Sequence, residues 1–132
     1  MMRESIRLEV PATVTSLPTA RMVLGGVALR IDLSLEELED LSLAATELFR
    51  AALDSEQLDS WIIEMAIVDD AVHLITGPYR SADLRRRLEG SSEERACLDL
   101  CRLLSSTVDS FEVSDNGEGF VVAMSKGRKH CT

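Results

Sequence analysis

The sequence has 132 residues, of which 45% are hydrophobic and 28% are charged, as is typical of one globular domain large enough to bury a core. Its formal net charge of −9 argues against nucleic acid as a partner, because clustered Lys and Arg bind phosphate backbones. No apolar run approaches the roughly 20 residues that span a bilayer, and the N-terminus has no signal-peptide pattern. We therefore expect one cytoplasmic domain over residues 1–132, with no membrane and no nucleic acid among its partners.

The first elements in chain order are a strand and a helix. Residues 6–10 alternate apolar and charged side chains, as a half-buried strand does, and Pro11 ends the strand. Ser16 is placed to cap the following helix, whose apolar residues repeat at helical spacing. Gly25 and Gly26 lie inside this helix, where each costs about 1 kcal/mol relative to Ala. We expect another backbone to approach this pair closely in compensation.

A longer helix and two strands follow. Ser34 and Glu37 form a capping box at the start of a helix over residues 35–53, and an apolar stripe runs along that helix. Residues 61–68 and 72–76 are apolar and β-branched, which predicts two strands joined by a tight turn.

The last third of the chain predicts two more helices and a pair of strands. Residues 77–92 form a loop that contains a short basic helix, and Ser91 with Glu94 makes a second capping box. The helix that follows is expected to bury Cys97, Leu100, Cys101, Leu104 and Val108. The cysteines are thus interpreted as small core residues rather than metal ligands, and their odd total of 3 suits a reducing compartment. Two alternating segments, "SFEVS" and "FVVAMSK", predict the final strands.

The order of these elements is β-α-α-β-β-α-α-β-β, without repeats or a domain boundary. It predicts an α+β two-layer sandwich, in which helices cover one face of a mostly antiparallel mixed sheet.

The stretch "VSDNGEGF" at residues 113–120 has two interpretations. Asp-Asn-Gly-x-Gly resembles the nucleotide-binding loop of Bergerat-fold ATPases, but only 13 residues follow Gly119, too few for the lid and strands that such a loop needs. Asn116-Gly117 between alternating strands is a strong hairpin signal, because both residues accept a positive φ. We expect an exposed hairpin turn here, with Phe111, Val113, Phe120 and Val122 in the paired strands.

Residues 10–53 and the tail "SFEVSDNGEGFVVAMSK" resemble the bacterial anti-sigma factors of the Bergerat-fold (GHKL) serine kinase family. The matching features are the Pro that closes the first strand, an Arg in the first helix and "EEL.DL..A..E" in the second helix. The resemblance implies a homodimeric protein that sequesters a sigma factor and releases it to an anti-anti-sigma (STAS) protein. Active members phosphorylate that antagonist.

The nucleotide motifs of the family are missing from this sequence. Glu47 matches the family's general base, but Ala51 stands where the magnesium-binding Asn is expected, and a methyl group has no lone pair for a metal. The adenine-reading Asp-x-Gly should fall at residues 75–80, which read "ITGPYR", and the phosphate-loop glycines at residues 96–100, which read "ACLDL". We therefore expect no cofactor, no metal and no catalytic residue, with Glu47 interpreted as a solvated or capping helix residue.

Four arginines are candidate partner-binding residues. Arg21 matches a first-helix arginine that contacts sigma factor and antagonist in relatives, and Arg85, Arg86 and Arg87 lie where the family's ATP lid faces the antagonist. The alternative for all four is a solvated charged helix surface. Two alternatives for the whole protein also stay open: an active serine kinase with divergent ATP loops, and a pseudo-ATPase that senses another small molecule.

Overall fold

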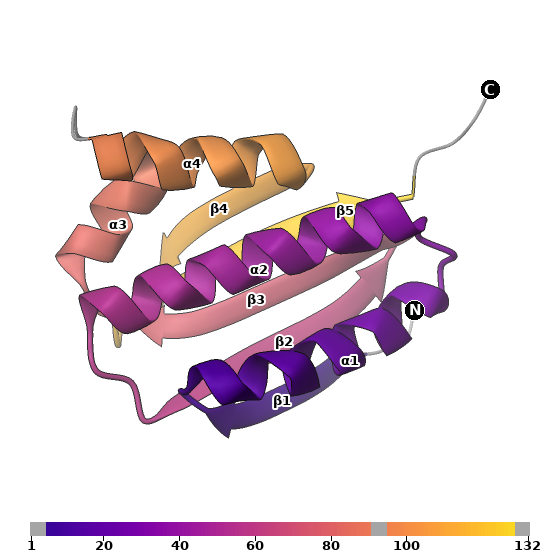
Figure 1. Cartoon of the computed structure of the whole chain (residues 1–132), viewed down its shortest axis with the longest axis horizontal. Helices are drawn as coiled ribbons and strands as arrows, with labels where there is room; N and C mark the ends of the chain where they lie inside the picture. Colours follow the sequence, from indigo (N-terminus) through magenta and orange to yellow (C-terminus); the bar gives the residue numbers. More distant parts are fainter. Residues whose placement is uncertain (1–4, 91–94, 129–132) are drawn as a thin grey trace.

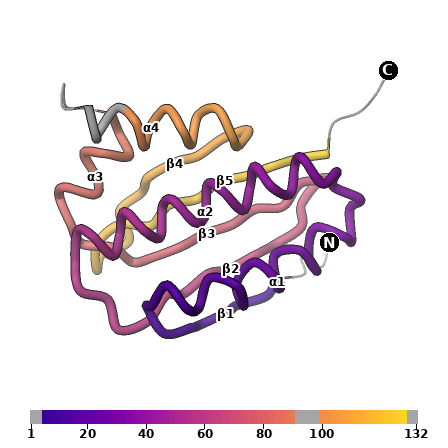
Figure 2. The backbone as a smooth tube through the Cα atoms, in the orientation of Figure 1, coloured from indigo at the N-terminus to yellow at the C-terminus, as the bar shows by residue number. Residues whose placement is uncertain are grey.

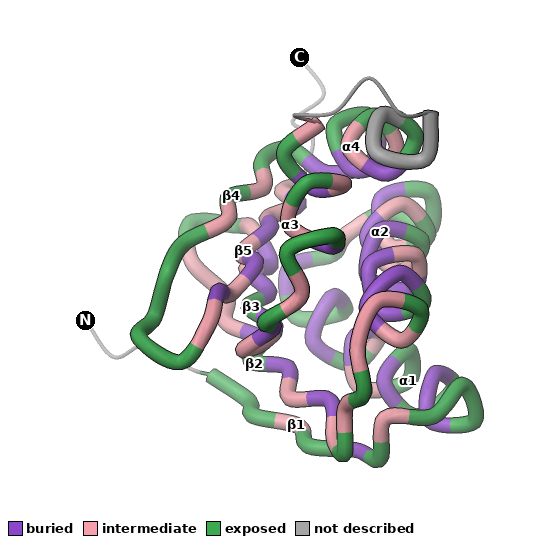
Figure 3. The backbone as a smooth tube through the Cα atoms, turned by 90° about the vertical axis from the view of Figure 1, so that its left-hand side faces the viewer, coloured by how far each residue is buried: buried purple, intermediate pink, exposed green. Residues whose placement is uncertain are grey.

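The structure, a computed structural model, describes residues 5–90 and 95–128, and it is built from one sheet with helices packed on a single face (Figures 1 and 3). The order of strands and helices is the predicted one, with a short 3-10 helix at Val14–Ser16 added before the first α-helix. The elements are β1 (Ser5–Pro11), α1 (Leu17–Leu29), α2 (Leu35–Ser55), β2 (Ser60–Val68), β3 (Ala71–Tyr79), α3 (Ala82–Glu89), α4 (Arg95–Thr107), β4 (Ser110–Asp115) and β5 (Phe120–Gly127). No helix within the described residues is long and apolar enough to cross a membrane.

The sheet has the strand order β1-β2-β3-β5-β4, and all four neighbouring pairs are antiparallel. The prediction of a mixed sheet is therefore wrong for the described part of the chain. The reason is the path after β3: the chain leaves the sheet through α3 and α4, enters the edge strand β4, and then returns as β5 beside β3 (Figure 2). The parallel pairing of β3 with β4 is thereby avoided.

Helix α2 forms as its sequence predicts. Ser34 Oγ accepts a hydrogen bond from the Glu37 backbone N–H at 3.0 Å, and Glu37 Oε1 accepts one from the Ser34 N–H at 2.8 Å, which confirms the first capping box. The predicted cap at Ser16 is wrong, because its side chain makes no capping hydrogen bond and the 3-10 turn supplies the start of α1 instead. The second predicted capping box, Ser91 with Glu94, lies outside the described residues.

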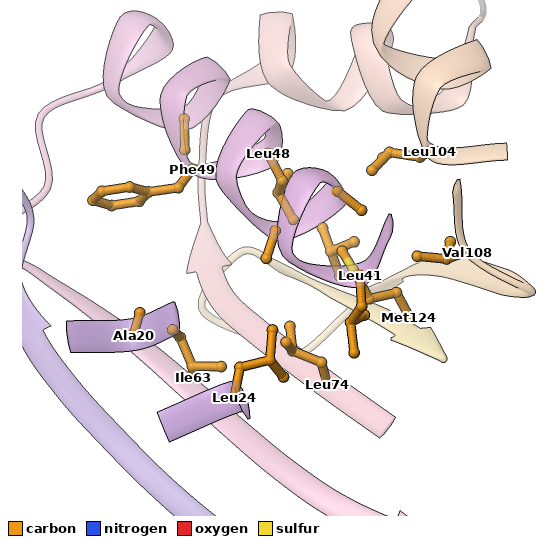
Figure 4. Close-up of a cluster of buried hydrophobic side chains, with 14 of the residues drawn as sticks. Ala20, Leu24, Leu41, Leu48, Phe49, Ile63, Leu74, Leu104, Val108 and Met124 are labelled. Atoms are coloured by element: carbon orange, nitrogen blue, oxygen red, sulfur yellow. The ribbon is translucent and has the colours of Figure 1, made fainter. Parts of the chain in front are cut away.

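The core lies between α2 and the sheet. Figure 4 shows Leu41 and Leu48 of α2 pointing toward the sheet residues Leu74 and Met124. At the other end of α2, the ring of Phe49 stacks on Trp61 with centroids 3.9 Å apart. These contacts make α2 the central helix of the helical layer, and they fix which of its side chains face α1 on one side and α4 on the other.

A buried polar chain anchors the end of β3. Trp61 Nε1 donates a hydrogen bond to the Tyr79 hydroxyl at 3.1 Å, and this hydroxyl donates to Thr76 Oγ1 at 2.9 Å. Burial raises the pKa of Tyr79 to about 12, against smaller opposite contributions from these two hydrogen bonds. The predicted loop at residue 77 begins later than expected, because β3 continues to Tyr79 through an irregularity between Thr76 and Tyr79.

The final hairpin confirms the structural interpretation of residues 113–120, with β4 and β5 paired from Ser110↔Ser125 to Asp115↔Phe120. The turn itself differs from the expected one. Gly117 and Gly119 have positive φ values of 88° and 158°, whereas the φ of Asn116 is not positive. The loop spans residues 116–119. The Asn116 N–H donates to the Gly119 carbonyl at 3.1 Å, and Asn116 Oδ1 accepts from the Glu118 N–H at 3.1 Å.

Two further expectations fail. Among the described residues, no backbone of another segment approaches the glycine pair of α1: a Cβ on Gly26 would have nothing within 4 Å outside its own helix, and one on Gly25 would meet only Leu38 Cδ2 at 3.9 Å. Cys101 is half-buried rather than buried, and its Sγ lies beside Gly90 at the end of α3. The side chain of Cys97 lies outside the described part of the structure. Leu100, Leu104 and Val108 are buried as predicted.

Candidate functional site

Glu47, the residue that the resemblance would make a general base, lies at the edge of a cleft between α2 and α4. The cleft has a volume of about 280 Å³ and is lined by Glu47, Arg50, Ala51, Asp54, Arg87, Asp99, Leu100 and Leu103. Glu47 is half-buried, and Ala51, one turn further along the same helix, is 3% exposed. Within the described residues, no group of three or more His, Cys, Asp or Glu side chains could hold a metal ion.

Apolar side chains occupy the space next to this cleft. Leu84 and Leu88 of α3 and Leu104 of α4 are each 0% exposed, and they belong to the same hydrophobic core as α2 and the sheet. Helices α3 and α4 thus pack onto α2 as a closed core layer.

The loop after β3 is also occupied by contacts within the chain. Glu56, at the end of α2, accepts hydrogen bonds at Oε2 from the backbone N–H groups of Arg80 (2.8 Å) and Ser81 (2.6 Å). The Ser81 hydroxyl accepts from the Leu84 N–H at 3.1 Å and caps α3. The backbone donors near the expected adenine loop are therefore satisfied by Glu56 and by the start of α3.

The three consecutive arginines of α3 point to different surroundings. Arg85 pairs with Glu89 and with Asp115, both at 2.6 Å, and its guanidinium lies 5.6 Å from the centre of the Phe120 ring. The hydrogen bond to Asp115 and then the one to Glu89 raise the pKa of Arg85 above its usual value. Arg85 thereby ties α3 to the β4–β5 hairpin.

The other two arginines of α3 diverge from Arg85. Arg86 is exposed and lies 3.2 Å from Asp83 on its own helix. Arg87 turns to the α2–α4 cleft, where its Nε is buried and has no hydrogen-bond partner within the described part of the protein. Because successive helical residues are about 100° apart, Arg85, Arg86 and Arg87 do not gather into one patch.

Arg21 lies on a different surface. Its Nη2 donates to Thr46 Oγ1 of α2 at 3.3 Å, and Thr46 itself is 4% exposed. Next to it, Met22 and Leu29 are 77% and 76% exposed, and Gly26 lies between them at helical spacing. We call Arg21, Met22, Gly26 and Leu29 the α1 face: an exposed apolar helix surface with a guanidinium beside it.

The structure keeps these two sets of arginines apart. Helix α2 lies between α1 and the α3–α4 pair, so Arg21 is not near the arginines of α3 (Figure 1).

The sequence did not predict the roles of two residues that make specific contacts at these surfaces. Thr46 lies among the apolar residues of α2 in the sequence. A polar residue at such a position is a signal of a specific side-chain contact, and this signal could have indicated its role. Lys126 continues the alternation of Phe120, Val122 and Met124, which places it on the core face of β5, where it is 5% exposed.

A scan against protein-family models and a search of curated proteins gave no match to this sequence.

Proposed function

We propose that this protein is a partner-switching regulator of the anti-sigma type. It would sequester a bacterial sigma factor and release it when an anti-anti-sigma (STAS) protein competes for an overlapping surface. The family resemblance of residues 10–53 suggests this function, and the α1 face is the observation that supports it best. A contiguous exposed apolar patch with polar residues at its edge is a mark of a protein–protein interaction site.

The α1 face offers both parts of a specific contact. Met22 and Leu29 supply apolar area, and Gly26 leaves the helix surface flat between them, with room for a partner backbone. Arg21 is held at its edge by Thr46, and one guanidinium can bind a partner carboxylate through two hydrogen bonds. In a chain with a net charge of −9, this arginine is a local positive site for an acidic segment.

Switching in this proposal uses competition and not phosphorylation by this chain. Ala51, which stands where the resemblance implies the metal-binding Asn, has a methyl side chain and is 3% exposed, and this supports a mechanism without a bound metal. Two partners that share the α1 face exclude one another, and the more abundant or tighter one displaces the other.

The test is transcription with purified components. Sigma factors and STAS proteins of the same organism are first screened pairwise against this protein, and each sigma factor that binds is combined with core RNA polymerase on its promoter. We expect this protein to repress one such holoenzyme at stoichiometric concentrations without ATP, and the cognate STAS protein to restore transcription. The proposal fails if no sigma factor binds, or if repression requires ATP.

One observation favours a second candidate, a sensor of a small molecule. The α2–α4 cleft holds about 280 Å³, and the buried Nε of Arg87 has no partner within the described residues. A thermal-shift screen of anionic metabolites tests it: a ligand that raises the melting temperature of the wild type but not of Arg87→Met would support a sensor. Calorimetric binding of ATP with magnesium would instead favour the kinase alternative.

A further inference from the structure

The pairing between β2 and β3 does not extend over the start of β2 or the end of β3. Its last pair is Ile63↔Thr76, and among the described residues no pair joins β3 to the first residues of β2, Ser60, Trp61 and Ile62. These three residues are paired with β1 on their other side. The sheet therefore opens into a wedge between the start of β2 and the end of β3.

A bulge in β3 explains the wedge. The register of β3 against β5 shifts between Thr76 and Tyr79, so that Gly77 and Pro78 lie opposite a single residue of β5. A bulge bends the strand that carries the extra residue. The bend brings β3 against β5, because a Cβ on Gly77 would lie only 2.9 Å from the Phe120 carbonyl oxygen. Strand β3 thus turns away from β2, and Pro78 has no N–H with which to resume the pairing.

A cleft of about 360 Å³ occupies the wedge, and residues 56–62 and 77–80 line it. Residues 56–59 belong to the loop between α2 and β2, which lies beside this end of the sheet (Figure 1). Trp61 and Tyr79 are the most buried of the lining residues, at 2% and 1% exposure, and a hydrogen bond joins their side chains. The cleft therefore reaches from the surface to the edge of the core, and its volume is within the range of ligand sites.

The wall formed by β2 carries backbone groups that are open to a ligand. Consecutive residues of a strand direct their N–H and C=O groups to opposite sides, so either Trp61 or Ile62 directs both groups into the wedge. Within the described residues, neither a registered pair with β3 nor a loop hydrogen bond takes up these groups. An extended peptide can pair with such a strand edge, and its main-chain hydrogen bonds then supply affinity.

Apolar side chains stand beside this edge. Leu58, Ile62 and Pro78 line the cleft and are half-buried, so each has apolar surface that a ligand can cover. Leu58 also packs against the hydrophobic core, whereas Ile62 is not part of that core. An apolar side chain of a peptide paired with β2 can lie among these three residues.

The charges around the cleft leave one carboxylate open. Glu56 Oε2 accepts hydrogen bonds from the backbone N–H groups of Arg80 and Ser81, and Arg80 Nε donates to the Glu118 carbonyl at 3.0 Å. The side chain of Asp59 is exposed, and in the described part of the chain its carboxylate has neither an ion pair nor a hydrogen bond. Asp59 is therefore placed to bind a Lys or Arg of a ligand.

We propose that this cleft binds an extended peptide segment of a partner protein, in which an apolar residue has a Lys or Arg close to it in sequence. The peptide backbone pairs with the start of β2, its apolar side chain lies among Leu58, Ile62 and Pro78, and its basic side chain binds Asp59. The three open residues of β2 span about 10 Å, so three or four residues of the peptide make the contact. The contact is small, and we expect a dissociation constant in the micromolar range.

Selection from a phage-displayed library of random octapeptides on the purified chain provides the probe. The most enriched sequence is then synthesised, and its binding is measured by calorimetry. We expect the enriched peptides to share an apolar residue with a Lys or Arg within two positions. Methylation of single backbone nitrogens along the synthetic peptide should weaken binding at every second position, because only alternate N–H groups of a paired strand face its neighbour.

A charge exchange tests the role of Asp59. Asp59→Lys should weaken binding of the selected peptide at least tenfold, and replacing the basic residue of the peptide by Glu should restore binding to this variant. Glu112→Lys is the matched control: it makes the same change of charge at an exposed position of β4, and it should bind as the wild type does. Ile62→Lys should also weaken binding at least tenfold with a nearly unchanged melting temperature, because Ile62 is outside the core.

The inference is overturned if no peptide is enriched, or if the selected peptide binds Asp59→Lys and Ile62→Lys as tightly as the wild type. Equal effects of methylation at all positions would overturn the pairing with β2. No residue of α1 lines the cleft, and the measurement contains neither a sigma factor nor a STAS protein. Its result is therefore separate from that of the proposed anti-sigma function.

Discussion

Replacing Gly119 by Ala should destabilise this protein strongly, because β3 runs directly against that residue. A Cβ built on Gly119 would lie 2.2 Å from the Tyr79 carbonyl oxygen and 3.1 Å from its carbonyl carbon. An ordinary contact between carbon and oxygen is longer by about 1 Å, so either the hairpin or β3 would have to move by that amount.

The structure indicates that neither can move easily. Tyr79 is 1% exposed, its hydroxyl is bonded to Trp61 and Thr76, and its backbone is paired with Phe120. Overpacking of a well-ordered site and the positive φ of Gly119 together should cost about 3–5 kcal/mol. For a domain of this size, this corresponds to a fall in melting temperature of roughly 10–20 °C.

Gly117→Ala is the matched control. Gly117 belongs to the same loop and has a φ of 88°, but a Cβ there would have nothing within 4 Å. Only the cost of the positive φ remains, about 1 kcal/mol. Thermal and urea unfolding of both variants decide the matter: equal losses, or a larger loss for Gly117→Ala, would refute the reasoning from the Tyr79 contact.

Four further outcomes are expected. Lys126→Met should lower the free energy of unfolding, measured in urea, by about 2–3 kcal/mol. The reason is that the buried Lys126 Nζ donates a hydrogen bond to the Thr107 carbonyl at 2.8 Å. A loss below about 0.5 kcal/mol would contradict this role. The raised pKa of Tyr79 implies stability that is fully present below pH 10 and is lost toward pH 12, at up to about 1.4 kcal/mol per pH unit, and Tyr79→Phe should remove this dependence. Tyr79 is the single tyrosine, so its phenolate absorbance should appear with a midpoint near 12. Arg21→Glu should weaken capture of the sigma factor at least tenfold while the melting temperature changes little, whereas normal binding would remove Arg21 from the interface. Calorimetry with ATP and magnesium should show no binding in the low micromolar range, and a constant in that range would promote the kinase alternative.

The element order and several local details of the fold could be predicted from the sequence. The capping box of Ser34 and Glu37 and the hairpin at Asn116-Gly117 are each specified by residues a few positions apart. Such signals depend on local backbone geometry, and they do not need the rest of the chain to be in place. The same holds for the apolar stripe of α2, which is buried as its spacing predicts.

The candidate site was predictable only in part. The absence of a metal ligand at Ala51 is a property of the sequence, but the packing of Leu84 and Leu88 beside α2 depends on how α3 folds back. The three arginines of α3 are adjacent in the sequence and were predicted as partner-binding residues, but the rotation of about 100° per helical residue points their side chains in different directions. Arg85 donates a hydrogen bond to Asp115, which lies 30 residues further along the chain in the hairpin.

The sequence by itself therefore determined what each segment becomes, because caps, turns and periodicity act over a few residues. Only the tertiary structure decided that β5 inserts between β3 and β4, because strand pairing joins residues that are far apart in the chain. The strand order also brings Gly119 close to the Tyr79 carbonyl and buries Lys126.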